Sequence, residues 1–229
     1  MKYYSTRKKS QEVSFRNAVI RGLAPDGGLY FPERIEKLPD GLIGCGKSIE
    51  ELGFEVAKRF VDGEIPEVNL EQIVSETVNF PLPVVEVETD VFSLELWHGP
   101  TCAFKDVGGR FLARCLEYFV KESGEKITIL VATSGDTGSA VAAGFLGVQG
   151  IDVVILYPKG LVSKIQEQQL TTMGQNISTL EVEGSFDDCQ AMVKQAFNDS
   201  ELRAAMKLSS ANSINVARFL PQSFYYFGS

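Results

Sequence analysis

The sequence predicts an α/β protein in which a parallel sheet is covered by helices on both faces and is preceded by a helix-rich N-terminal region. In the second part of the chain, buried apolar runs alternate with amphipathic helices, and this alternation is typical of parallel sheets. The four runs span residues 94–97, 127–132, 153–157 and 177–182. Pro81 and Pro83 precede them, which predicts two domains, residues 1–82 and 83–229.

Helices are also predicted at both ends of the chain. In the N-terminal region, three stretches carry apolar residues at helical spacing, and the extended segment GGLYFP interrupts them. These stretches span residues 15–22, 49–61 and 70–78. After the last apolar run, a helix over residues 186–197 is capped by Ser185, and another is predicted over residues 213–226.

One lysine, Lys105, lies between a predicted strand and a predicted helix. Residues 91–97 alternate as a strand does, and a Gly-Pro pair ends them. The helix is expected to begin at Asp106, which is placed as its N-terminal cap, so that Lys105 is the last residue of the turn. Desolvation beside Phe104 and near Arg110 would disfavour its ammonium form and make it a nucleophile. The alternative is an ordinary surface lysine.

A turn of small residues, 133–139, follows the apolar run 127–132 and opens a helix. Backbone N–H groups at such a helix end are suited to hold a carboxylate or a phosphate, although a well-capped turn without a ligand would have the same sequence. The turn lacks the lysine of a P-loop and the glycine spacing of a dinucleotide site, which disfavours nucleotide binding. Both this turn and Lys105 follow predicted strand ends, where open α/β sheets bind ligands.

The composition excludes several classes of function. Apolar residues make up 44% and charged residues 23% of the chain, and no apolar run is long enough to span a bilayer. The net charge of −8 argues against nucleic acid or an anionic membrane as a partner. A polar N-terminus without a secretory signal favours the cytoplasm. The cysteines lack CxxC spacing and there is one histidine, His98, so a zinc site is disfavoured and free thiols are expected at Cys45, Cys102, Cys115 and Cys189.

Several motifs, in the same order and spacing, are similar to those of threonine synthases. They are YYSTR at 3–7, GLAPDGGLYFP at 22–32, ELWHGPTCAFKD at 95–106, ATSGDTGSA at 132–140, YPKGLVSKIQEQQ at 157–169, FDDCQ at 186–190 and SANSINVARFLPQSFYYF at 210–227. The chain resembles the long-chain branch of that family, which has a substantial domain before the lysine.

The resemblance implies a fold type II pyridoxal-phosphate enzyme, a carbon–oxygen lyase that converts O-phosphohomoserine and water to threonine and phosphate. Carried over residue by residue, it makes Lys105 the catalytic lysine, which forms a Schiff base with the cofactor, pyridoxal 5'-phosphate. Asp136 and Asn212 are implied as further cofactor-binding residues. The implied substrate-binding residues are Thr133, Ser134, Gly135, Thr137 and Arg218, and no metal ligand is implied.

The chain is shorter than members of that family, which continue well beyond residue 229. It lacks the glycine-rich loop that holds the cofactor phosphate in the family. We therefore expect the C-terminal part of the enzyme to be missing, and we expect this chain alone to bind the cofactor poorly and to turn over little substrate.

Three other interpretations of function remain. A threonine-synthase-like phospho-lyase would release a keto acid from the same kind of substrate, and a non-catalytic fragment would act as an interaction or anion-binding module. The motifs SGDTG and SANSIN argue against a third, a serine or threonine dehydratase.

His98 either positions cofactor or substrate phosphate or makes a structural hydrogen bond. Leu161 replaces a basic residue of many relatives and either removes a phosphate contact or faces solvent; the remaining candidates for phosphate are Lys159, Lys164, Arg110 and Arg218.

Overall fold

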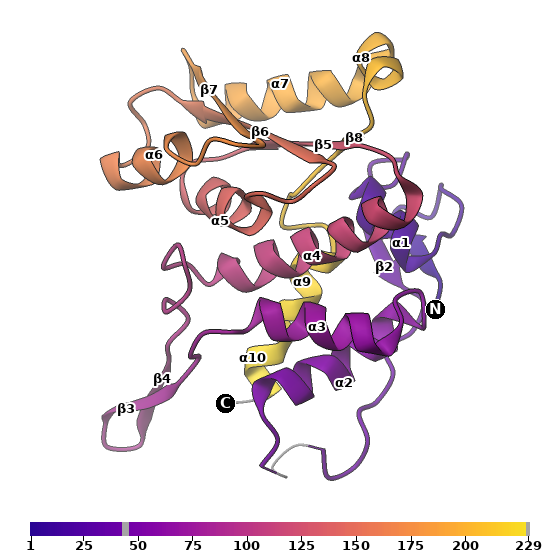
Figure 1. Cartoon of the computed structure of the whole chain (residues 1–229), viewed down its shortest axis with the longest axis vertical. Helices are drawn as coiled ribbons and strands as arrows, with labels where there is room; N and C mark the ends of the chain where they lie inside the picture. The colour runs from indigo at the N-terminus through magenta and orange to yellow at the C-terminus, as the bar shows by residue number, and fades with distance from the viewer. Residues whose placement is uncertain (43–45, 228–229) are drawn as a thin grey trace.

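A four-stranded parallel sheet forms one end of the molecule, at the top of Figure 1, in a computed structural model that describes residues 1–42 and 46–227. The strand order is β7-β6-β5-β8. The strands are β5 (Ile127–Ala132), β6 (Ile151–Pro158), β7 (Ile177–Val182) and β8 (Leu208–Ser209). Each neighbouring pair is parallel, so the four carboxyl ends lie at one edge of the sheet. The runs predicted at 127–132, 153–157 and 177–182 are confirmed as strands, whereas the two-residue β8 was not predicted.

Helices cover both faces of this sheet, as predicted. On one face α7 (Phe186–Asn198) contacts β5 and β6, and on the other α5 (Asp136–Phe145) contacts β6 while α6 (Lys164–Thr171) contacts β7 (Figure 1). The predicted cap of α7 is confirmed, because the Ser185 side chain accepts from the Asp188 N–H and the Asp188 carboxylate accepts in return from the Ser185 N–H. The six-residue α8 (Ser200–Ala205) follows α7.

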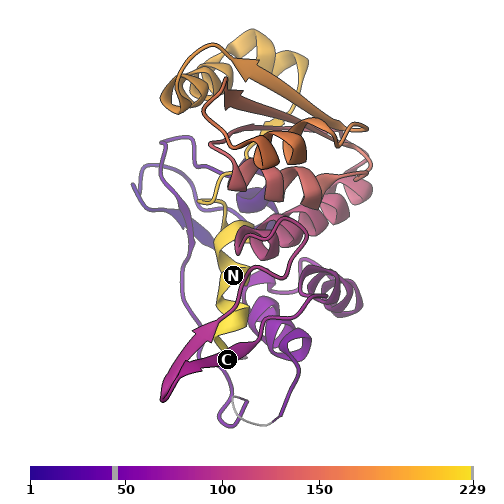
Figure 2. The ribbon, with the colours of Figure 1, turned by 90° about the vertical axis from the view of Figure 1, so that its left-hand side faces the viewer.

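The prediction of a sheet strand over residues 94–97 is wrong. The chain instead forms an antiparallel hairpin of β3 (Val84–Glu88) and β4 (Val91–Leu94), which reaches away from the rest of the molecule (Figure 2). Two residues, Thr89 and Asp90, connect the strands, and Asp90 has the positive φ of 61° that tight hairpin turns require. Of the predicted run, only Leu94 lies in a strand, where it pairs with Val84, and Trp97 is 50% exposed.

The N-terminal part contains the three predicted helices and two strands, of which one lies in the segment GGLYFP that was expected to be extended and the other was not predicted. The helices are α1 (Phe15–Arg21), α2 (Ile49–Val61) and α3 (Glu67–Thr77), and the antiparallel strands are β1 (Tyr3–Ser5) and β2 (Tyr30–Pro32). Glu64, which is not part of α1, caps the start of that helix, because its carboxylate accepts hydrogen bonds from the N–H groups of Phe15 (2.7 Å) and Arg16 (3.0 Å). The Ser48 side chain and Glu51 form a capping box that fixes the start of α2.

The C-terminal segment is not the single helix predicted over residues 213–226. Three short helical pieces follow one another: α9 (Val216–Phe219), the 3-10 helix η1 (Leu220–Ser223) and α10 (Phe224–Phe227). Pro221 lies in the 3-10 helix, where its ring and missing N–H prevent a continuous α-helical ladder. These pieces run along α4 (Lys105–Ser123) and reach α2.

One cluster of buried apolar side chains joins both parts of the chain. It includes Tyr3 and Phe15 from the N-terminal part, Phe111 and Phe145 from α4 and α5, and Phe224 from α10. The core therefore crosses residue 82, and the division into domains 1–82 and 83–229 stays a prediction. Within the described ranges, no helix combines the length and apolar character that crossing a membrane requires.

Candidate active site

Lys105 is the first residue of α4 and not the last residue of the preceding turn. The predicted capping role of Asp106 is wrong, because the residue before the helix is Phe104 and Asp106 lies inside the first helical turn. The buried Asp106 carboxylate instead accepts hydrogen bonds from the Thr101 N–H (2.9 Å) and the Thr101 hydroxyl (2.5 Å). Asp106 therefore stabilises the turn that precedes Lys105.

The Lys105 amine forms an ion pair with Asp136, the first residue of α5. The distance from Lys105 Nζ to Asp136 Oδ2 is 3.0 Å, and 24% of the lysine side chain is exposed. Nζ also lies 4.5 Å from the centre of the Phe104 ring, which is a cation–π contact. Lys105 thus has an aromatic and a carboxylate neighbour and is less exposed than Lys58, a surface lysine with the same two kinds of neighbour that is 44% exposed.

Arg110 does not face Lys105, contrary to expectation. Its guanidinium donates to the Glu76 carbonyl oxygen and to Asn79 Oδ1, and it packs on Phe80. Burial is the main cause that lowers the pKa of Arg110. This arginine therefore joins α4 to the end of α3 and contributes no charge beside the lysine.

Three glycines bring α4 against its neighbours. A Cβ on Gly109 would lie 2.8 Å from the Ala140 carbonyl oxygen of α5, and one on Gly144 would lie 3.0 Å from the Gly109 backbone. On the other side of α4, a Cβ on Gly108 would lie 2.6 Å from the Arg218 carbonyl oxygen. Because these contacts reach the backbone, any side chain would force the helices apart. The starts of α4 and α5 meet as a result.

The turn before α5 is organised by the hydroxyl of Thr133. This buried oxygen accepts from the N–H groups of Gly135 (3.0 Å) and Gly138 (2.8 Å) and donates to the Gly135 carbonyl oxygen (3.2 Å). Thr133 therefore shapes the turn from inside, and its contact with a substrate stays a prediction. Ser134 is exposed and Thr137 is half-buried. As the first helical residues, Asp136 and Thr137 direct their N–H groups out of the helix end.

Gln166 is a site residue that the sequence did not single out. Its side-chain Nε2 lies 2.5 Å from Asp136 Oδ1, the carboxylate oxygen that does not face Lys105. The residue is part of the motif at 157–169, three positions after Ser163, which caps α6. That position predicts a residue in the first turn of a helix, but only the fold brings it to Asp136.

The residues of the motif at 210–215 follow β8 and divide into buried and exposed groups. Asn215 is fully buried: its Nδ2 donates to the Val19 carbonyl oxygen (2.9 Å), and its Oδ1 accepts from the Ala217 N–H (3.0 Å). Asn212 is exposed, after a strand that pairs in parallel with β5. Asn212 is therefore accessible near the carboxyl edge of the sheet, whereas Asn215 holds α9 to α1.

Arg218 is fully buried and donates from Nη1 to the Ala211 carbonyl oxygen (2.7 Å). Burial lowers its pKa to about 10. In the part of the chain that is described, its Nε has no hydrogen-bond partner. Its role in binding the substrate stays a prediction.

The other candidates for phosphate or cofactor contact lie at the surface. His98 Nε2 is 2.6 Å from Glu95 Oε2, which favours the structural alternative for this histidine. Leu161 is 64% exposed, which favours the solvent-facing alternative. Lys159 is paired with Glu183, and Lys164 is exposed at the start of α6. The described cysteines Cys102, Cys115 and Cys189 are free, as expected, and Cys45 lies outside the described residues.

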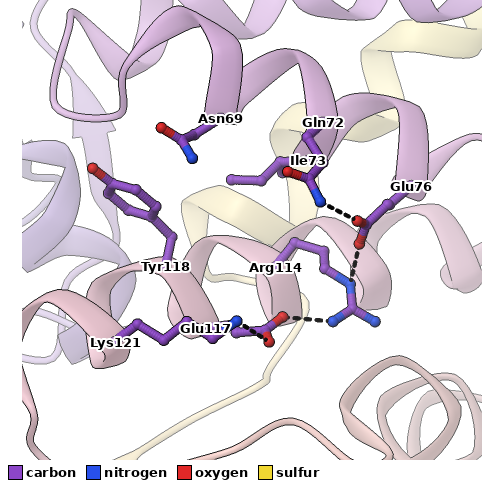
Figure 3. Close-up of a pocket in the computed structure, with 8 residues that line it drawn as sticks. All are labelled: Asn69, Gln72, Ile73, Glu76, Arg114, Glu117, Tyr118 and Lys121. Carbon is purple, nitrogen blue, oxygen red and sulfur yellow. Dashed lines mark hydrogen bonds and ion pairs between the residues drawn. The ribbon is translucent and has the colours of Figure 1, made fainter.

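A separate pocket between α3 and α4 has a volume of about 130 Å³ (Figure 3). Arg114 bridges Glu76 (3.0 Å) and Glu117 (2.6 Å), and Glu117 also pairs with Lys121 (2.8 Å). Arg114 lies nine residues after Lys105, about 13 Å along the helix. The charges of this pocket compensate one another, and the pocket is distant from the Lys105 amine.

Comparisons with known proteins agree with this arrangement. Residues 2–78 match the family model described as threonine synthase N terminus, and residues 70–219 match that of pyridoxal-phosphate dependent enzymes. Threonine synthases of Haemophilus influenzae and Escherichia coli are 48% and 47% identical over 99% of this chain. A crystal structure of threonine synthase from Brucella melitensis with bound pyridoxal phosphate covers 100% of this chain with a TM-score of 0.93 and 44% identity. A threonine synthase structure from yeast covers 99% with a TM-score of 0.89 and 38% identity.

The chain spans about half the length of these proteins. It covers 53% of each of the two bacterial relatives, 51% of the Brucella melitensis chain and 48% of the yeast chain.

Proposed function

Because this chain belongs to the family of pyridoxal-phosphate-dependent enzymes and resembles threonine synthases over 99% of its length, we propose that it supplies the lysine-bearing part of a threonine synthase. The reaction would convert O-phosphohomoserine and water to threonine and phosphate. The observation that carries the proposal is the 3.0 Å contact between Lys105 Nζ and Asp136 Oδ2, because it joins the two sequence motifs at one site.

The residues at this site fit pyridoxal phosphate. Lys105 offers an amine that can bond to the cofactor aldehyde, and Asp136 lies within hydrogen-bonding distance of that amine. The exposed Asn212 is a further candidate for cofactor contact. When bound, the cofactor supplies an electron sink for a carbanion next to the substrate nitrogen. The cofactor phosphate is not assigned to any group of this chain.

Lys105 would act as the proton carrier of the reaction. Its amine, at the start of α4, would take a proton from the substrate α-carbon and move protons at the β-carbon. Its partner Asp136 keeps the amine at this edge of the sheet. One amine can therefore serve as both base and acid.

The start of α5 would hold the substrate carboxylate. The exposed Ser134 and the half-buried Thr137 each offer a hydroxyl there, and the N–H groups of the first helical residues carry the positive end of the helix dipole. Gly135 has a φ of 138°, which a residue with a side chain rarely adopts, and Thr133 holds the turn from inside. A carboxylate fixed at this turn would orient the bond to the α-hydrogen toward Lys105.

Local groups, and not the net charge of −8, would attract this anionic substrate. Arg218 is proposed to contribute as a buried cation close to the substrate site. We also propose that the protein works in the cytoplasm on a small molecule, with no nucleic acid or membrane as a partner.

The test is an absorbance scan of the purified chain with pyridoxal phosphate, compared with Lys105→Ala. A band that borohydride traps, and that mass spectrometry assigns to Lys105, would support the proposal. Attachment to other lysines at the same rate in both proteins would contradict it. Lys126→Ala is the matched control, because it removes an exposed lysine that is distant in sequence from Lys105.

Product analysis separates the two catalytic alternatives. The chain is mixed with a polypeptide that comprises the rest of the Escherichia coli threonine synthase, and O-phosphohomoserine is added. Threonine with phosphate supports the proposed function, and a keto acid with phosphate would indicate a phospho-lyase. Absence of any product, together with absence of cofactor attachment, would favour the non-catalytic alternative.

A further inference from the structure

The side chain of Gln166 connects α6 to the ion pair of Lys105 and Asp136. Its Nε2 donates to Asp136 Oδ1 at 2.5 Å, while Lys105 Nζ donates to Asp136 Oδ2 at 3.0 Å. The two carboxylate oxygens therefore each receive one donor, from two different helices. A carboxylate held at both oxygens cannot rotate freely, although 53% of the Asp136 side chain is exposed.

Ser163 fixes the orientation of the Gln166 amide. The Ser163 hydroxyl accepts from the Gln166 N–H (3.3 Å), so its own proton is available, and it donates this proton to Gln166 Oε1 (3.0 Å). The amide oxygen thus faces a donor, and the amide nitrogen faces a carboxylate that can only accept. The cap of α6 and the ion pair are therefore linked through one side chain.

Gly135 provides the space for this amide. A Cβ on Gly135 would lie 2.5 to 2.6 Å from the amide carbon, oxygen and nitrogen of Gln166. The Gln166 side chain thus packs directly on the backbone of the turn before α5. Its position is set by the turn on one side and by Ser163 on the other.

We propose that Gln166 is a positioning residue that holds the Asp136 carboxylate against the Lys105 amine. This inference rests on the proposed function, because it gives Gln166 a part in preparing the lysine for the cofactor. The charged residues in the first turns of the three helices are Lys105 and Asp106 in α4, Asp136 in α5, and Lys164 and Glu167 in α6. The buried Asp106 carboxylate is already bound to Thr101, so Asp136 is the acidic partner that Gln166 can control.

The experiment measures how fast Lys105 reacts with trinitrobenzenesulfonate as a function of pH, with mass spectrometry resolving the peptide that contains Lys105. Gln166→Met keeps the length of the side chain and removes both amide hydrogen bonds. We expect the pH midpoint of labelling to fall, because the Asp136 carboxylate is then no longer held beside the amine. Gln166→Glu places a second carboxylate beside Asp136, so we expect the midpoint to rise.

Asp136→Asn provides the decisive comparison. If Gln166 acts through Asp136, adding Gln166→Met to Asp136→Asn leaves the midpoint of the single variant unchanged. An equal shift in both backgrounds would overturn the proposal, as would a wild-type midpoint in Gln166→Met. Gln168→Ala, an exposed position of the same helix, is the control and should behave as the wild type.

This labelling needs neither cofactor nor turnover, so it separates the two proposals. If pyridoxal phosphate does not attach to Lys105 even when the rest of the Escherichia coli threonine synthase is added, the proposed function fails while the coupling between Gln166 and Asp136 is still measured. If the cofactor attaches and Gln166→Met leaves labelling unchanged, the positioning role alone is overturned.

Discussion

Gly109 of α4 approaches Ala140 of α5 so closely that a Cβ at position 109 would lie 2.8 Å from the Ala140 carbonyl oxygen. Lys105 lies four residues before Gly109, and Asp136 lies four residues before Ala140. The ion pair therefore forms one helical turn before the point where the two backbones touch. The close packing of the helices accounts for the meeting of a lysine and an aspartate that are 31 residues apart in the sequence.

The first prediction concerns this helix contact. Gly109→Ala forces a methyl group against the α5 backbone, and overpacking of this kind costs about 1–3 kcal/mol. The better helix propensity of alanine offsets up to about 1 kcal/mol of that loss. We expect urea denaturation to show a net decrease in the free energy of unfolding of about 1–2 kcal/mol. Ser123→Ala, at the exposed end of α4, is the control, and a Gly109→Ala protein as stable as this control would contradict the prediction.

The second prediction separates the two asparagines of the motif at 210–215. Asn215→Ala removes the cap of α9 and leaves the Val19 carbonyl oxygen without its buried donor, so we expect a loss of stability of about 2–4 kcal/mol. Asn212→Ala changes an exposed side chain and should cost less than about 0.5 kcal/mol. Thermal and urea unfolding of both variants measure the difference. Equal losses would show that the buried contacts of Asn215 do not stabilise the fold.

Much of the fold could be predicted because its signals are local. The helix at 49–61 and the cap at Ser185 depend on apolar spacing and on a capping residue, which the sequence shows directly. The strands at 127–132 and 177–182 are short apolar runs, and the structure confirms them. The run at 94–97 is also short and apolar, yet its prediction as a strand of the parallel sheet was wrong, because strand pairing depends on tertiary context.

The candidate site could be predicted only in part. The sequence singled out Lys105 and the turn that contains Asp136, because each stands beside a strand or a helix start. The contact between Lys105 and Asp136 could not be predicted, because it depends on helix packing at Gly109. Gln166 could not be predicted as a neighbour of Asp136 either. It also placed Arg110 near the lysine, whereas the arginine bonds to the end of α3.

The third prediction concerns acid stability through Asp26, which joins the two N-terminal motifs. Its carboxylate accepts from the Ser5 hydroxyl (2.6 Å) and from the N–H groups of Gly28 (2.9 Å) and Lys9 (2.9 Å). These hydrogen bonds lower the pKa of Asp26 from 3.8 to about 2, and the bond from Ser5 contributes most to this shift. Because the folded pKa lies below the unfolded one, the stabilisation is complete above the unfolded pKa and is lost as the pH falls through 3.8 toward 2.

We therefore expect Asp26→Asn to reduce the loss of stability that the wild type shows between about pH 5 and pH 3. The measurement is the urea midpoint at several pH values in this range. Asp40→Asn, at a side chain that is 92% exposed, is the matched control and should keep the wild-type pH dependence. Parallel pH curves for Asp26→Asn and the wild type would refute the role of Asp26.

The last prediction concerns the hairpin of β3 and β4, which carries apolar side chains outside the core. Val87 and Phe92 are 56% and 60% exposed, and the hairpin reaches away from the rest of the molecule (Figure 2). Exposed apolar surface on a two-stranded ribbon favours association with other chains, because both apolar groups and strand edges gain partners. We expect concentration-dependent self-association in sedimentation velocity and expect Phe92→Lys to reduce it. Ile35→Lys, at an apolar side chain outside the hairpin that is 68% exposed, should have no such effect. If Ile35→Lys reduced association as strongly as Phe92→Lys, general surface charge and not the hairpin would be the cause.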